Sequence, residues 1–225
     1  MDFFAEVFTP TIGKAIWKAT IETFEMVVIS GVITAVIGLL LGILLHVTGK
    51  GGLTPVRWLN VVLSGIIVNI TRSIPFAILM VALIPFSAWL IGTSLGPIAA
   101  SVSLTIGTIP FFARLVETAL RDVNSGKIDA AQVMGSTKLQ IIRKVMVPEA
   151  MPGIIAAITT TVVTLIGYSA MAGMVGGGGL GRLAYNYGYT RFDPPIMIAT
   201  IIIIVVLVQI AQIIGDLIAR KVDHR

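Results

Sequence analysis

The sequence contains no cysteine and little charge. The absence of cysteine excludes disulfides, thiolate metal ligands and a cysteine nucleophile. Only 12% of the 225 residues are charged, whereas about a quarter is usual in soluble domains. Hydrophobic residues make up 56% of the chain. A soluble fold could not bury this much apolar surface, so the composition predicts an integral membrane protein.

Other absences exclude further kinds of site. The two histidines, His46 and His224, are far apart in the sequence, so no metal site is predicted. No G-x-x-x-x-G-K-[ST] phosphate loop occurs, so ATP-driven work would have to be energised by a partner. Gly176, Gly178 and Gly181 spell G-x-G-x-x-G, but they follow a predicted membrane helix and not a strand. We interpret them as an external loop or gate.

Charge-free apolar runs predict five transmembrane helices, because about 20 apolar residues cross the hydrocarbon core. The predicted spans are approximately 20–48, 58–90, 97–116, 150–175 and 195–218. Pro75 and Pro85 interrupt the long second span. Gly38 and Gly42, four residues apart, predict close helix packing. We therefore predict an all-α integral membrane protein with one transmembrane domain, residues 1–225.

The N-terminal segment is not predicted to be a cleavable signal peptide, because it is charged of both signs and has no short apolar core. It is instead predicted to form an amphipathic helix on the membrane surface, interrupted by Pro10. The apolar residues that indicate this helix are Phe3, Phe4, Val7, Phe8, Ile12 and Ile16.

The net charge of +5 is typical of a membrane protein with basic cytoplasmic loops, so no nucleic-acid partner is predicted. With five spans the termini face opposite sides. Eleven of the 16 Lys and Arg residues lie on the side of the C-terminus and Arg72 lies within span two. The other side has Lys14, Lys18, Arg182 and Arg191. The positive-inside rule predicts an external N-terminus and a cytoplasmic C-terminus.

The cytoplasmic segment of about 121–148 is predicted to form two short helices joined by a tight turn. Gly135 suits a left-handed turn after the first helix. Thr137 and Gln140 have capping-box spacing for the second helix. Two such helices suggest a docking element for a partner, and the alternative is an ordinary loop lying on the membrane surface.

This segment resembles the EAA loop of ABC importer permeases, which has Glu-Ala-Ala, three residues, Gly, nine residues and Ile-x-Leu-Pro. Asp129, Val145 and Val147 depart conservatively from that pattern. The resemblance implies a type I ABC importer permease fold in which this loop forms the coupling helices for an ATPase subunit. The matching coupling residues are Asp129, Ala130, Ala131, Gly135, Val145, Val147 and Pro148.

Further segments resemble the methionine uptake permeases. They are Asn69–Phe76, Gly167–Met171, Gly179–Gly181 and Tyr185–Tyr189. The resemblance covers nearly the whole chain and implies a subunit of the bacterial cytoplasmic (inner) membrane that imports L-methionine, with D-methionine as a further candidate. It also implies a homodimer with two cytoplasmic ATPases, which bind ATP and Mg, and an extracytoplasmic substrate-binding protein. No cofactor is expected on this chain.

Polar residues within the spans are candidates for the translocation pathway or gate. A charge in a span costs about 2.5–3.5 kcal/mol and usually faces protein or water, so Arg72 either shapes the pathway or snorkels to the interface. Tyr168 either faces the pathway or serves packing. The candidates are Asn69, Arg72, Ser73, Tyr168, Ser169 and Met171.

Three alternatives remain. One is a permease for another small amino acid. A second is an ion-coupled secondary transporter. Such proteins usually have internal repeats and acidic residues within the spans, but here no Asp or Glu lies in the central part of any predicted span. The third is an enzyme, which is disfavoured because no nucleophile, base and orienting residue occur together. The chain is therefore predicted to be a transporter subunit without catalytic residues.

Overall fold

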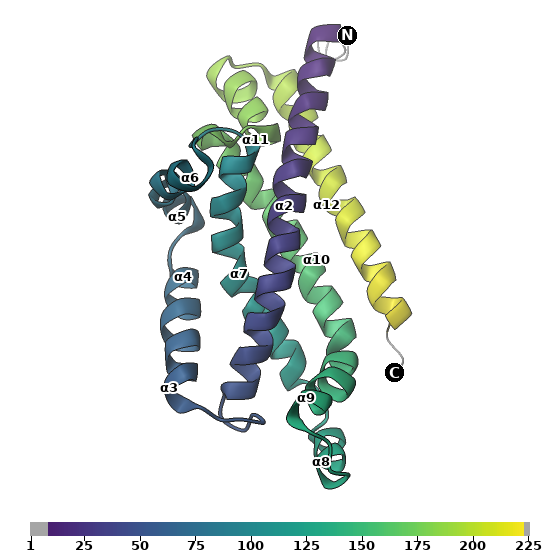
Figure 1. Cartoon of the computed structure of the whole chain (residues 1–225). Helices are drawn as coiled ribbons and strands as arrows, with labels where there is room; N and C mark the ends of the chain where they lie inside the picture. Colours follow the sequence, from purple (N-terminus) through teal and green to yellow (C-terminus); the bar gives the residue numbers. More distant parts are fainter. Residues whose placement is uncertain (1–8, 223–225) are drawn as a thin grey trace. The chain divides into compact units, whose positions relative to one another are not determined.

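The computed structural model describes residues 9–222, and these residues are helical throughout apart from short connections (Figure 1). The predicted all-α class is confirmed for this part of the chain. Phe3, Phe4, Val7 and Phe8, which predicted a surface helix, lie outside the described residues, as does His224.

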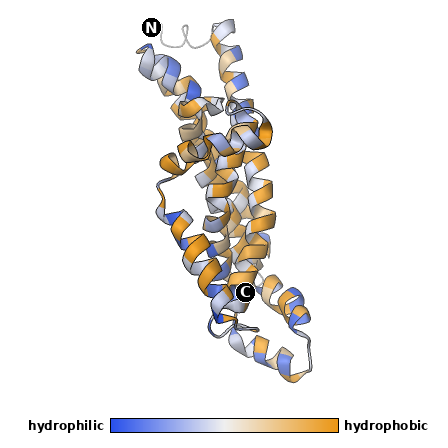
Figure 2. Ribbon diagram, turned by 60° about the vertical axis from the view of Figure 1, so that its left-hand side comes forward, coloured by the Kyte–Doolittle hydropathy of each residue, from blue (hydrophilic) through white to orange (hydrophobic). Residues whose placement is uncertain are grey.

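Within residues 9–222, four helices are long and apolar enough to cross a membrane. They are α2 (Pro10–Thr48), α7 (Pro97–Arg121), α10 (Val147–Ala172, reached from Lys138 without a break) and α12 (Pro194–Val222). Hydrophobic colouring runs along the long helices in Figure 2. Helix α2 begins at Pro10 and includes Ile12 and Ile16, while the earlier part of the predicted surface helix lies outside the described residues. Proline suits the start of a helix because its missing N–H would be unpaired in a first turn anyway.

Between α2 and α7, the helices Arg57–Ser73 and Phe76–Ala82, bent by 98° at the break between them, make a fifth span if they are counted as one broken span. The whole connecting segment has five elements. It contains α3 (Arg57–Asn60), the π-helical η1 (Val61–Val68), α4 (Asn69–Ser73), α5 (Phe76–Ala82) and α6 (Ile84–Ile91). Helix α4 ends at Ser73, just before Ile74 and Pro75. A proline disfavours helical geometry in the residue that precedes it. A second break, at Leu83, precedes Pro85 in the first turn of α6. The predicted interruptions at the two prolines are thus confirmed.

The chain divides into two compact units, each with its own core. One contains residues 9–33, 74–108 and 162–212, and the other contains 34–73, 109–161 and 213–222. In the first, Met26 of α2, Leu104 of α7 and Leu165 of α10 are fully buried together with Met80 of α5.

In the second unit α2 packs closely on α7. A Cβ atom built on Gly38 would lie 2.7 Å from Cδ1 of Phe112, and one on Gly42 would lie 2.6 Å from Cβ of Val116. Real Cβ atoms do not approach this closely, so only glycine fits at these contacts. The predicted close packing at Gly38 and Gly42 is confirmed.

Six shorter elements complete the described part of the chain. They are α8 (Ser125–Val133) and α9 (Lys138–Ile141), with the π-helical η2 (Ile142–Met146) leading into α10, and, after α10, η3 (Gly173–Gly177), α11 (Gly179–Leu183) and η4 (Ala184–Thr190).

Candidate functional site

The segment between α7 and α10 forms two short capped helices, as the sequence predicts. The Asn124 side chain caps α8 by accepting a hydrogen bond from Gly126 N at 2.8 Å. Gly135 then adopts φ +77°, the left-handed conformation that glycine reaches without strain. Thr137 and Gln140 form a reciprocal capping box at the start of α9. We call Ser125–Met146 the two-helix loop.

The inner side of the two-helix loop is part of the core of its unit. Ala131, Ile141 and Met146 are at most 3% exposed. They belong to one buried cluster with Leu120 of α7 and Ile154 of α10. A displacement of the loop therefore acts directly on both long helices, because close-packed interiors transmit strain.

The outer side of the loop carries apolar side chains that nothing in the described chain covers. Val133 is 89% exposed, Met134 78% and Leu139 64%. We call these three residues the apolar patch. They flank the Gly135 turn, and the neighbouring residues are polar. Exposed apolar side chains with polar neighbours are a common feature of interaction surfaces.

An ion pair ties α8 to the first turn of α10. Lys127 Nζ lies 2.6 Å from Glu149 Oε2. Glu149 is well placed for this role, since a carboxylate near a helix N-terminus is favoured by the helix dipole. The two-helix loop is thus fastened to α10 by a polar contact in addition to its buried residues.

The residues predicted from the EAA pattern divide between the two sides of the loop. Ala131 faces the core, so its small size serves packing within this chain. Val145 and Val147 are half-buried. The outward-facing members are Asp129, Ala130, Gly135 and Pro148.

The predicted pathway residues also fall into two groups, one in each compact unit. Asn69, Arg72 and Ser73 lie in α4. Ser73 donates a hydrogen bond to the carbonyl of Asn69 at 2.8 Å. The Arg72 side chain is exposed and has no carboxylate within ion-pair distance among residues 9–222.

The second group lies near the end of α10. Tyr168 stacks on Phe76, with ring centroids 4.0 Å apart and planes 3° from parallel. Ser169 is buried and donates to the carbonyl of Ile166 at 2.7 Å. Met171 is 37% exposed. The Ser169 hydroxyl is therefore occupied by a hydrogen bond within its own helix. The side chains of Tyr168 and Met171 remain partly exposed at the surface of the chain.

Sequence reasoning missed a polar network that surrounds Arg114. Its guanidinium donates to Glu117 at 2.7 Å and to Ser64 and Asn69 at 2.9 Å each. Arg121 binds the other oxygen of Glu117 at 2.8 Å. The spacing of Arg114, Glu117 and Arg121, at i, i+3 and i+7, was the available signal, since such residues share one helix face.

The glycine-rich segment after α10 is held by side chains from α2. Glu22 accepts a hydrogen bond from Gly179 N at 2.7 Å, and Thr23 accepts one from Leu180 N at 2.9 Å. Gly178 and Gly179 have positive φ angles. A Cβ atom on Gly179 would lie 2.6 Å from the Thr23 hydroxyl. These glycines permit a tight reversal of the chain against α2.

Residues 38–224 match the family of binding-protein-dependent transport system inner membrane components. The chain is 54% identical to the probable D-methionine transport system permease protein MetI of Vibrio cholerae, over 92% of each chain. It is 48% identical to the methionine import system permease protein MetP of Bacillus subtilis, over 93% of this chain and 94% of that one.

A solved structure is also similar over nearly the full length. It belongs to a set of inward-facing conformations of the MetNI methionine ABC transporter. The match has a TM-score of 0.94 and 45% identity, and covers 96% of this chain and 100% of the other. These comparisons confirm the resemblance to ABC importer permeases and the predicted permease fold.

Proposed function

Because this chain belongs to the family of binding-protein-dependent transport system inner membrane components, we propose that it is the permease subunit of an ATP-driven methionine importer. The substrate is proposed from the methionine permeases that match more than nine-tenths of the chain. L-Methionine and D-methionine are both candidates. The observation that carries the role of energy-coupled permease is the two-helix loop, exposed and apolar on one side and joined to two spans on the other.

The apolar patch is proposed to dock into a cytoplasmic ATPase. Burial of Val133, Met134 and Leu139 would contribute about 1.5–3 kcal/mol for each side chain that is fully covered. Movement of the ATPase would reach α7 and α10 through Ala131, Ile141 and Met146. The partner would bind ATP and Mg, since this sequence has no phosphate loop.

We propose an assembly of two copies of this chain with two ATPases and an extracytoplasmic substrate-binding protein. In α12, 11% of the most apolar window is buried within the chain. An apolar surface left uncovered within the chain can contact lipid or a second copy of the chain. Closed two-fold dimers are the commonest homo-oligomers. The distribution of Lys and Arg supports an external N-terminus and a cytoplasmic C-terminus in the bacterial inner membrane.

Asn69, Arg72, Ser73, Tyr168, Ser169 and Met171 remain the proposed lining of the pathway or its gate. Support for Asn69 comes from its hydrogen bond to Arg114, which fixes the amide in one orientation. Support for Tyr168 comes from the stacked Phe76 ring, a flat apolar surface beside a hydroxyl. Such a pair suits a substrate with an apolar side chain and polar backbone groups.

The test is uptake of labelled methionine into vesicles that contain this chain with and without its ATPase and binding protein. ATP-dependent accumulation only in the complete system is expected. Competition with other unlabelled amino acids separates methionine from another small amino acid as substrate. Uptake by the chain alone, driven by an ion gradient, would identify a secondary transporter and contradict the proposal.

A further inference from the structure

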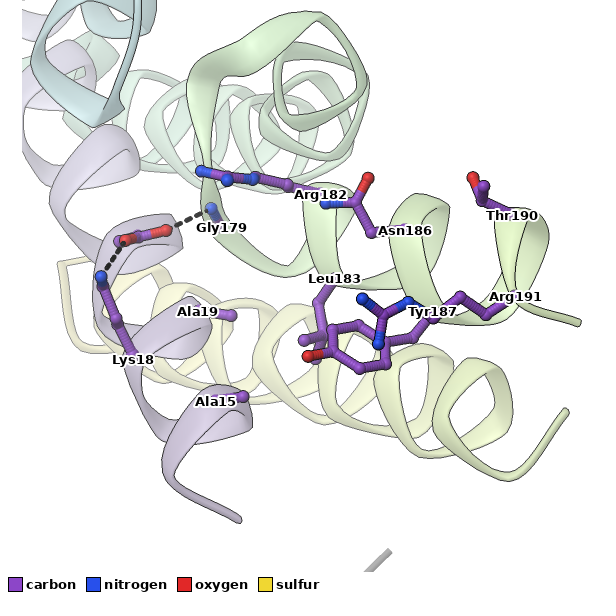
Figure 3. A pocket seen from close by; sticks show the side chains of 11 residues that line it. Ala15, Lys18, Ala19, Gly179, Arg182, Leu183, Asn186, Tyr187, Thr190 and Arg191 are labelled. Atoms are coloured by element: carbon purple, nitrogen blue, oxygen red, sulfur yellow. Dashed lines mark hydrogen bonds and ion pairs between the residues drawn. The ribbon is translucent and has the colours of Figure 1, made fainter. Parts of the chain in front are cut away.

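A recess of about 580 Å³ lies between the first turns of α2 and the segment from Gly179 to Arg191 (Figure 3). All of its lining residues belong to one compact unit. Its charged side chains are Lys18 and Glu22 from α2, Arg182 from α11, and Arg191, which follows η4. Three cations and one carboxylate therefore share a single open recess.

The carboxylate in the recess is already engaged. Glu22 accepts the hydrogen bond from Gly179 N and lies 3.8 Å from Lys18 Nζ. Neither Arg182 nor Arg191 has a carboxylate within ion-pair distance in the described part of the chain. The guanidinium of Arg191 is held over the ring of Tyr187, 4.5 Å from its centroid. The recess thus has a net positive charge, with one arginine held by an aromatic ring.

These cations are unusual for the side of the membrane on which we place them. Extracytoplasmic segments are poor in Lys and Arg. The predicted outer side of this chain has four, and three of them line this recess, while Lys14 does not. Like charges that lie close together repel one another, which costs free energy unless an opposite charge nearby compensates them. The arrangement therefore points to an anionic ligand.

We propose that this recess receives an acidic surface loop of the extracytoplasmic substrate-binding protein. The proposal rests on the importer function and orientation proposed above. Lys18, Arg182 and Arg191 are all exposed, so a small free anion would stay largely hydrated there. A protein surface that carries several carboxylates pairs with all three cations and is steered toward them. Arginine and tyrosine, as at Arg191 and Tyr187, are enriched at interface hot spots.

The test measures the affinity of the binding protein for the complex of permease and ATPase in phosphatidylcholine nanodiscs. The variant Lys18→Glu/Arg191→Glu is expected to weaken binding at least tenfold. Its affinity should also depend less on salt, because charged contacts are lost. Lys14→Glu is the matched control, since Lys14 is an exposed lysine one helical turn from Lys18 that does not line the recess. It should bind within about twofold of wild type.

Two results would overturn the inference. One is equal affinity of wild type and double variant, when both assemble with the ATPase. The other is a double variant that keeps its affinity for the binding protein but no longer gains thermal stability from phosphatidylglycerol, which would assign the recess to lipid headgroups. Failure of the wild-type complex to import methionine is a separate outcome that refutes the proposed function, whatever the affinities.

Discussion

Lys127 and Glu149 are 22 residues apart in sequence, and their charged groups are 2.6 Å apart. This contact joins α8 of the two-helix loop to the start of α10. Both side chains are partly exposed, at 53% and 34%. A pair of this kind contributes about 0–1 kcal/mol to stability. Its importance is therefore expected to be in transmitting movement more than in folding.

The first prediction follows from this pair. Lys127→Ala and Glu149→Ala should each change the melting temperature little, while lowering the methionine transported per ATP hydrolysed about twofold to threefold. The expected size corresponds to the loss of one exposed ion pair. Transport and hydrolysis measured in the same proteoliposomes give the ratio. A double variant that loses as much as both single variants combined would show that the two residues act independently.

The second prediction concerns the turn at Gly135. With φ at +77° and open space around a built Cβ atom, Gly135→Ala should cost about 1 kcal/mol through backbone strain alone. Asn and Asp both tolerate this conformation better, so they isolate the effect of charge. Gly135→Asn should bind the ATPase nearly normally and Gly135→Asp should not. Pull-down of the ATPase at equal expression decides this, and normal binding and uptake by Gly135→Asp would exclude the turn from the docking surface.

The third prediction concerns the contact of α2 with α7. Gly42→Ala places a methyl group 2.6 Å from Cβ of Val116 and 2.7 Å from the carbonyl oxygen of Ala113. Overpacking of this kind costs about 1–3 kcal/mol. Gly13→Ala is the control in the same helix, since nothing lies within 4 Å of that position. We expect a lower melting temperature in detergent for Gly42→Ala only, and equal melting of both variants would mean that α2 does not approach α7 this closely.

The fourth prediction concerns Arg114. Its replacement by Met removes hydrogen bonds to Glu117, Ser64 and Asn69. Because the Glu117 side chain is only 9% exposed, the loss of these hydrogen bonds should lower the free energy of unfolding by about 1–3 kcal/mol. Arg121 still pairs with Glu117 and so compensates part of its negative charge. Arg114→Lys keeps the charge but not the planar fork of donors, so it should restore only part of the loss. Thermal unfolding of the three proteins measures this, and a wild-type melting temperature for Arg114→Met would show that the network adds no stability.

Much of the fold could be predicted from local patterns. The breaks at Pro75 and Leu83 follow from backbone chemistry that proline imposes on its neighbours. The start of α9 follows from the four-residue pattern of Thr137 to Gln140. Close approach at Gly38 and Gly42 follows from the spacing of two small residues on one helix face. Each signal lies within a few residues of the feature that it predicts.

Features that depend on distant residues could not be predicted in this way. Arg114 of α7 donates hydrogen bonds to Ser64 and Asn69, which are 50 and 45 residues away, in addition to its ion pair with Glu117. The pattern of Gly176, Gly178 and Gly181 predicts an external loop or gate, but nothing local indicates that Glu22 and Thr23, 157 residues from their partners, hold this segment in place. The inward direction of Ala131 likewise depends on the core formed with α7 and α10.

The buried side of the two-helix loop also has a consequence for the order of biogenesis. Ala131, Ile141 and Met146 have no core to enter until α7 and α10 have come together. Helices as short as α8 and α9 are marginal in water without tertiary packing. The apolar patch therefore takes its described shape only in a chain whose α7 and α10 have already come together. If the proposed ATPase recognises this shape, it would distinguish finished permeases from unfinished ones.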